Sequence, residues 1–322
     1  MKAKTTPLDE QLKSAAGAGK TADCLDLLRR GAKIDYPGDD LVSTALHRAA
    51  RGGHLETCIA LLDAGANAAV EDGLAGLIAV QSAAASVSPR ALATTLGLLA
   101  YPGMPQKNQY GRHPLHAAVQ SGTIETVQGL LDFGVDVNTV NQYGWTALHE
   151  AIQFRKTAAI QLLLKRGADV HAISASGLAP VHTVKCVESL VECISSGIDI
   201  EVQGVRGLRL IHHACSLAQT SLVQALVAVG ANTDHCYAFV KAVGECFHKS
   251  PFVNAIQCGN AEIMGLHLAR FGAPSKEELK KSKRALTKNS EMSAVLNAHL
   301  ARVAIENVLK ASPPKANPCL VV

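Results

Sequence analysis

The side chains best suited to chemistry in this sequence are histidines and cysteines, and their spacing limits what they can do. Five histidines recur along the chain at spacings of 69, 33, 33 and 30 residues: His47, His116, His149, His182 and His212. Neutral imidazole is a common metal ligand in proteins. Residues at equivalent points of stacked units, however, lie about 10 Å apart, whereas a zinc ion lies about 2 Å from its ligand nitrogen. The series therefore predicts a structural role and no shared metal site.

A second group of candidate ligands is irregular: His235, Cys236, Cys246 and His248, with Cys258 beyond them. Thiolate and imidazole are the ligands that zinc prefers. The spacing matches no zinc knuckle, and the residues between the two cysteines are mostly apolar, as in a buried helix. Ordinary burial is the favoured interpretation. A redox-sensitive cysteine, or an enzyme or metal-binding protein that uses residues 235–258, remains an alternative.

Catalytic motifs are absent from the sequence. It contains no G-x-S-x-G, no phosphate-binding loop and no H-E-x-x-H. We therefore expect no catalytic residue and no cofactor.

A net charge of +4 on 322 residues does not favour nucleic acid as a partner. Nine cysteines at irregular spacing indicate a reducing compartment, and no apolar run predicts a signal peptide or a transmembrane helix, so we expect a cytoplasmic protein.

The elements that position these residues repeat with a period of 33. Residues 114–118 (PLHAA) align with residues 147–151 (ALHEA), and the leucine pair 130–131 aligns with the pair 163–164. Glycines that can end a helix or form a turn recur in register with them. A fixed period of this length indicates stacked units, because one such unit cannot bury its own apolar face.

This pattern resembles the ankyrin repeat, with its T-P-L-H helix start, its second helix ending in L-L and its G-A-D-V-N loop. The resemblance implies an all-α solenoid of about eight helix-turn-helix repeats in which the T-P-L-H histidine bonds to the backbone. The repeat starting at Gly207 comes three residues early, which predicts a shortened helix or loop near residues 185–188. We expect the following organisation: a repeat array over 8–273, degenerate at 73–105 and with an insertion at 235–249, a helical C-terminal cap over 274–311, and a flexible tail over 312–322.

The resemblance also implies a non-enzymatic scaffold or adaptor, which binds a partner protein on a concave face of turn tips and first helices. Aromatic and arginine side chains are the usual anchors of protein interfaces. Those that the repeat does not require are the candidate partner-binding residues: Tyr110, Arg112, Tyr143, Trp145, Phe154 and Arg155. The alternative is that Trp145 and the tyrosines pack along the row of turns and stiffen the stack. We expect a monomer.

The last four residues, CLVV, resemble a CaaX box that carries a prenyl group on Cys319. The proline-rich stretch from Ser312 would make this thiol accessible. One lipid chain with little basic support predicts reversible, peripheral membrane association. An unmodified end and a PDZ-type ligand using Leu320 and Val322 are alternatives. Ankyrin proteins with such tails also occur among bacterial effectors that act on host proteins, and that origin remains a second alternative.

Replacing the acceptor thiol tests the tail. In a eukaryotic cell, Cys319→Ser should release any membrane-bound pool into the soluble fraction, because the hydroxyl cannot take the place of the thiol that accepts the lipid. Fractionation and immunoblotting measure the two pools. Equal membrane fractions for both forms would remove the CaaX interpretation.

Overall fold

The computed structural model describes residues 7–37, 43–217, 219–231 and 293–300, together with four isolated positions between 264 and 279. The expected insertion at 235–249, the Cys/His group, most of the expected cap and the tail with Cys319 lie outside the described residues. Residues 293–300, which fall within the expected cap, are helical.

Helical segments follow one another in pairs through residues 7–231. Their bounds are α1 (Pro7–Gly17), α2 (Thr21–Arg29), α3 (Ala45–Gly52), α4 (Leu55–Asp63), α5 (Ala79–Ala84), α6 (Ala91–Leu99), α7 (Pro114–Ser121), α8 (Ile124–Asp132), α9 (Ala147–Gln153), α10 (Thr157–Lys165), η1 (Pro180–Thr183), α11 (Val187–Ser195), η2 (Val205–Gly207), α12 (Leu210–Ser216) and α13 (Thr220–Ala228). The described residues contain no β-strand, only an isolated bridge between Val140 and Thr146. No helix among them is long and apolar enough to cross a membrane.

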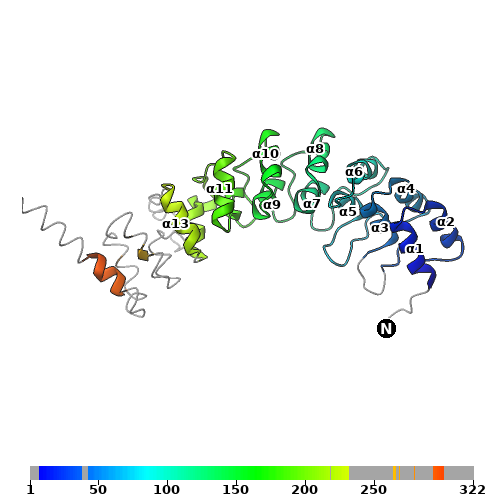
Figure 1. Ribbon diagram of the computed structural model, residues 1–322, viewed down its shortest axis with the longest axis horizontal. Helices are drawn as coiled ribbons and strands as arrows, with labels where there is room; N and C mark the ends of the chain where they lie inside the picture. The colour runs from blue at the N-terminus through cyan, green and yellow to red at the C-terminus, as the bar shows by residue number, and fades with distance from the viewer. Residues whose placement is uncertain are drawn as a thin grey trace, which may run out of the picture. The chain divides into compact units, whose positions relative to one another are not determined.

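The chain divides into two compact units: Met1–Thr183 with Ser195–Ile198, and Val184–Ile194 with Asp199–Val322. In the first unit, α1, α3, α5, α7 and α9 contact one another in this order, and α2, α4, α6, α8 and α10 do the same. We call the first set the first helices and the second set the second helices. Figure 1 shows the pairs in sequence order, with α6, α8 and α10 above α5, α7 and α9. In the second unit, α12 packs against α13.

Small and aliphatic side chains fill the core of the first unit. The first leucine of each expected L-L pair is almost fully buried, as at Leu61, Leu130 and Leu163. Alanines of the first helices, such as Ala118 and Ala151, are buried as well. A small side chain at these positions lets neighbouring first helices approach closely, which explains why the chain needs few aromatic residues.

The expected shortening of one repeat falls on its first helix. Pro180–Thr183 forms a single 3-10 turn where the preceding repeats have an α-helix, and α11 begins at Val187. The missing residues therefore come from the end of the first helix and from the turn that follows it. The division between the two compact units runs through this same repeat.

Three of the recurring histidines, on α3, α7 and α9, connect their helix to the loop of the next repeat. His47 Nε2 lies 2.9 Å from Leu77 O, His116 Nε2 lies 3.0 Å from Trp145 O, and His149 Nε2 lies 3.1 Å from Leu178 O. The other ring nitrogen, Nδ1, accepts a hydrogen bond from the backbone N–H of the residue before the helix. At α9, for example, Thr146 N–H donates to His149 Nδ1 at 3.1 Å. Because Nδ1 accepts, Nε2 must carry the hydrogen and donate it to the carbonyl. The structural role expected for the histidines is confirmed at His47, His116 and His149.

One repeat begins differently, with a histidine at the helix cap. His113 stands before α7 where Thr44 and Thr146 stand before α3 and α9, and its Nδ1 accepts from Leu115 N–H at 3.1 Å. Burial lowers the pKa of His113 to about 4, with added repulsion from His116. Burial also lowers the pKa of His116 to about 4, although its bond to Trp145 O partly offsets the effect.

These two pKa values predict a loss of stability in acid. Both lie below the ordinary value of 6.5, so the unfolded chain binds more protons and stability falls as the pH drops from about 6.5 to about 4. Each histidine accounts for roughly 3 kcal/mol across this window. His113→Thr keeps a capping oxygen and removes one titrating group. Urea unfolding followed by circular dichroism should therefore give a shallower decline in this variant, whereas parallel curves for variant and wild type would contradict the assignment.

Candidate interaction surface

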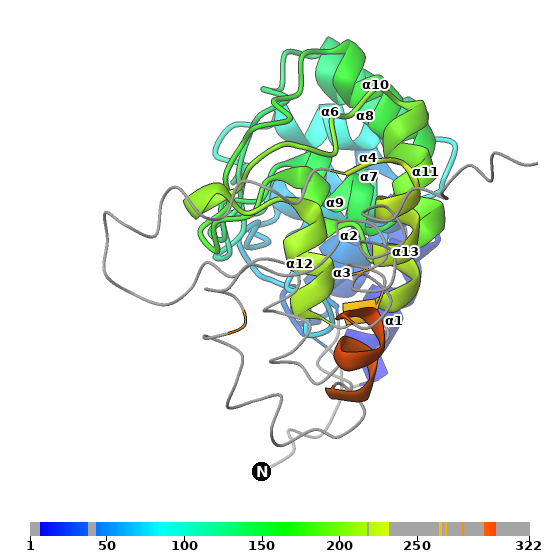
Figure 2. The same ribbon diagram turned by 90° about the vertical axis from the view of Figure 1, so that its left-hand side faces the viewer.

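The loops that join each second helix to the next first helix end in tight turns, which we call the tips. At two adjacent tips an asparagine side chain holds the turn: Asn108 Oδ1 accepts from Tyr110 and Arg112 N–H, and Asn141 Oδ1 accepts from Tyr143 and Trp145 N–H. In Figure 2 the loops following α6 and α8 project from one side of the helices. The tip residues are therefore held away from the helices by a backbone of fixed conformation.

Adjacent tips are also bonded to each other. Gln142 N–H donates to Tyr110 O at 2.9 Å, and Ala175 N–H donates to Tyr143 O at 2.8 Å. At Gly144, where φ is +71°, a Cβ atom would lie 2.9 Å from Ala175 N, so only glycine fits both the conformation and the close approach. These bonds fix the spacing of the tips along the first unit.

Tyr110 and Tyr143 extend from these adjacent tips into solvent. Their side chains are 42% and 57% exposed. One edge of the Tyr110 ring covers Gly76 of the preceding tip, where a Cβ atom would lie 2.9 Å from the ring. The structure thus brings these two predicted residues together as a pair of exposed rings on a row of bonded turns.

Trp145 packs within the stack of repeats, which was the alternative to partner binding that the sequence left open. Its ring stacks on the imidazole of His149, with ring centroids 5.7 Å apart and an interplanar angle of 23°. Its carbonyl accepts the hydrogen bond from His116. Trp145 therefore packs against the histidine of its own repeat, and only part of its surface faces solvent.

Arg112 likewise serves the fold. Its guanidinium Nη2 lies 2.9 Å from Glu150 Oε2 and also donates to Gln120 Oε1, and the Arg112 and Glu150 side chains are only 15% and 7% exposed. Burial raises the pKa of the Glu150 carboxyl, and the neighbouring guanidinium partly offsets this rise. Removing one partner would leave a buried charge uncompensated. The ion pair holds the tip of one repeat to the first helix of the next, a task different from the partner contact expected for Arg112.

Phe154 and Arg155 lie at the other end of the first helices. They follow α9, whereas the tips precede it, and a helix of this length separates the two ends by about 10 Å. Phe154 is 41% exposed and Arg155 is exposed. The six predicted residues therefore do not form one patch, because the tips carry four of them and the turn after α9 carries two.

An open groove lies beside this second location. Its lining includes four buried residues that form the floor, the half-buried Ile124, and the exposed Lys156, which marks the rim. The four floor residues are Ala118, Val119, Val127 and Ala159. Its volume is 220 Å³. Sequence reasoning missed this groove, because its lining residues are ordinary small and aliphatic members of two successive repeats.

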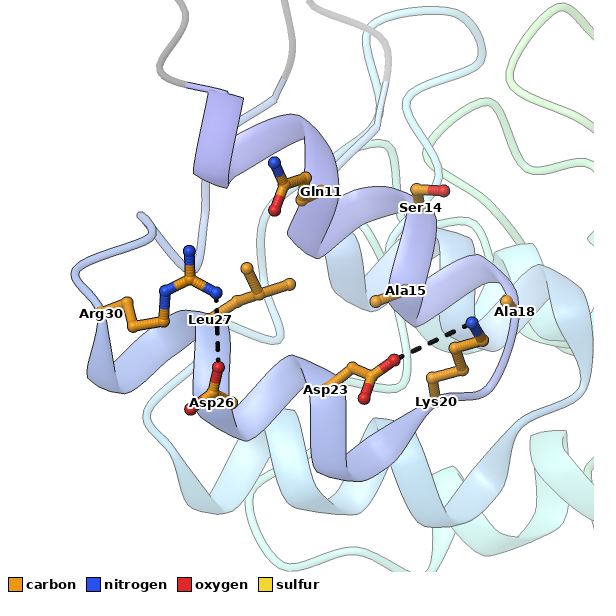
Figure 3. A pocket seen from close by; sticks show the side chains of 9 residues that line it. All are labelled: Gln11, Ser14, Ala15, Ala18, Lys20, Asp23, Asp26, Leu27 and Arg30. Atoms are coloured by element: carbon orange, nitrogen blue, oxygen red, sulfur yellow. Dashed lines mark hydrogen bonds and ion pairs between the residues drawn. The ribbon is translucent and has the colours of Figure 1, made fainter.

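A larger depression lies on the face of α1 and α2 (Figure 3). Its charged side chains pair along α2, with Lys20 Nζ 3.9 Å from Asp23 Oδ2 and Arg30 Nη1 3.5 Å from Asp26 Oδ2. All four side chains are more than half exposed. Exposed pairs of this kind contribute little energy and compensate one another's charge, so this depression is a weaker candidate than the tips or the groove.

The described residues offer no group of three or more His, Cys, Asp or Glu side chains that could hold a metal ion. Cys58 and Cys193 are buried, and burial raises the pKa of each thiol to about 12. Such thiols are poor nucleophiles at neutral pH, because the thiolate is the reactive form.

Comparison with protein families gives two matches: a model of ankyrin repeats in three copies matches residues 83–174, and a model of the single ankyrin repeat matches residues 43–73. A search of curated proteins finds no match. The three-copy match over residues 83–174 includes α6, which lies in the stretch expected to be degenerate.

Solved structures include two similar ankyrin repeat domains. That of Bcl-3, a member of the IkappaB protein family, is 27% identical, covers 67% of this chain and 97% of its own, and has a TM-score of 0.50. That of human ASB11 is 23% identical, covers 71% of this chain and 99% of its own, and has a TM-score of 0.50; this likeness shows the fold alone. The chain therefore has the all-helical ankyrin-repeat fold, and its residues 43–73 and 83–174 are ankyrin repeats by sequence as well.

Proposed function

We propose that this chain is a non-enzymatic adaptor that binds a partner protein through its tips. Ankyrin repeats generally mediate protein–protein interaction, and proteins built from them are typically non-enzymatic. The identity of the partner is not contained in the fold, because the same scaffold serves many partners.

The observation that carries this proposal is the pair of exposed tyrosines on adjacent bonded tips. Tyr110 and Tyr143 are 42% and 57% exposed on turns whose backbone is fixed by asparagine side chains and by bonds between tips. A tyrosine ring supplies a large contact area with few rotatable bonds. Because the backbone is already ordered, binding costs less conformational entropy than it would on a mobile loop.

Two further parts of the proposal rest on the sequence. The protein is cytoplasmic, and it attaches peripherally to a membrane through Cys319. The supporting features are the odd number and irregular spacing of the cysteines, for the compartment, and the CaaX-like ending, for the attachment. Attachment would raise the local concentration of the adaptor near membrane-bound partners.

Removing both rings tests the role of the tips. Tyr110→Ser combined with Tyr143→Ser should weaken partner binding by about 10–100-fold, the range typical of aromatic anchors. Exposed side chains contribute little to packing, so the melting temperature should change little. Proteins captured from extracts of the source cells by immobilised wild type and double variant would be compared by quantitative mass spectrometry.

Phe133→Ser is the matched control, since it removes an aromatic ring that is 53% exposed at the end of α8, away from the tips. Proteins retained by wild type and by Phe133→Ser should be depleted with the double variant. An identical set of captured proteins with all three forms would show that the tips do not bind the partner.

A further inference from the structure

The short turns between first and second helices form an edge of the first unit, which we call the turn edge. It comprises residues 18–20, 53–54, 85–90, 122–123 and 154–156. These turns carry Lys20, Arg90, Arg155 and Lys156 and contain no acidic residue. Arg90, Arg155 and Lys156 are exposed. Lys20 pairs with Asp23 on the following helix. The first turns of α2, α4 and α8 add Asp23, Glu56 and Glu125 beside these turns, whereas α10 has no acidic residue in its first turn. The turn before α10 is therefore the most basic stretch of the turn edge.

The groove described above opens on this edge. It runs between the start of α8 and the start of α10, with an apolar floor and Lys156 at the rim. Glu125, in the first turn of α8, is not among the lining residues. Phe154 stands two residues from Lys156 and is 41% exposed. Lys156 thus lines the apolar cleft, and the two residues before it in the chain are a second cation, Arg155, and an exposed ring, Phe154.

The backbone at Arg155 strengthens the case for function. Its φ is +55°, and it is the one non-glycine residue with positive φ among the described residues. The equivalent residues before α2 and α4 are Gly19 and Gly53, with φ of +72° and +78°. A non-glycine side chain in this conformation is strained, and such strain is concentrated at sites of function. The chain has a strained arginine where two of its other repeats have a left-handed glycine.

We propose that the part of the turn edge formed by residues 122–123 and 154–156 binds a short acidic segment of a partner protein. One branched aliphatic side chain of the segment occupies the groove, and its flanking carboxylates pair with Lys156 and Arg155. Charge complementarity identifies the partner, because a basic rim around an apolar floor matches acidic residues around an aliphatic one. This inference deepens the proposed adaptor function by adding a second contact surface, separate from the tips.

Selection from a phage-displayed library of random peptides on the immobilised full chain tests this proposal. Peptides that combine acidic residues with a leucine, isoleucine or valine should be enriched. Their binding, measured by fluorescence anisotropy of the labelled peptides, should weaken at higher salt because exposed charge pairs are screened. Lys156→Glu should weaken it by at least about tenfold.

Lys165→Glu is the matched control, because Lys165 is an exposed lysine in the last turn of the same helix and its change alters the charge equally. It should leave peptide binding unchanged. Enrichment of peptides without acidic residues, equal binding to the two lysine variants, or no enrichment at all would overturn the inference. Peptides lost with Tyr143→Ser but kept with Lys156→Glu would overturn it too, while leaving the proposed role of the tips intact.

Arg155→Gly separates function from stability. Glycine adopts the left-handed conformation without strain, so the melting temperature should rise by about 2–4 °C. Binding of the selected peptides should weaken several-fold, because one cation is lost. A variant that is more stable and binds the peptides as well as wild type would show that Arg155 takes no part in recognition.

Discussion

The first unit depends on one interaction repeated along the chain, the hydrogen bond from a buried imidazole to a carbonyl in the loop of the next repeat. His47, His116 and His149 each make it, at 2.9–3.1 Å. The same ring accepts a backbone N–H at the start of its own helix. A buried polar group is tolerated only when it is hydrogen-bonded, and here both ring nitrogens are. Burial lowers the pKa of all three histidines, which keeps the rings neutral and the bonds intact at neutral pH.

This bond determines which loop residues remain for binding. The carbonyl that His116 uses belongs to Trp145, so the backbone of that residue is committed to the stack, and its ring packs on His149. Arg112 is committed in the same way by its ion pair with Glu150. Tyr110 and Tyr143, each two residues before Arg112 or Trp145, keep their rings exposed to solvent. Neighbouring residues of one loop thus divide between holding the repeats together and offering a surface.

The fold could be predicted from the sequence because residues of the same type recur at equivalent positions of successive repeats. In the two most regular repeats, the buried leucines Leu130 and Leu163, the bonded histidines His116 and His149 and the turn glycines Gly111 and Gly144 all recur with the period of 33. The candidate site could be predicted only in part. Tyr110 and Tyr143, which were predicted to bind a partner, are exposed, and their role in binding stays a prediction. The pairing of Arg112 with Glu150, 38 residues away, depends on a contact between repeats that no local pattern encodes. The groove beside Lys156 arises from alanines and valines that read as ordinary core.

The most direct test of this account is the tautomeric and protonation state of the bridging histidines, measured by nitrogen-15 NMR on the labelled full chain at pH 7. The account predicts that His47, His116 and His149 are neutral, with the hydrogen on Nε2 and an unprotonated Nδ1. Imidazolium signals, or a hydrogen on Nδ1, would contradict the claim that these rings accept at their own helix and donate to the next repeat.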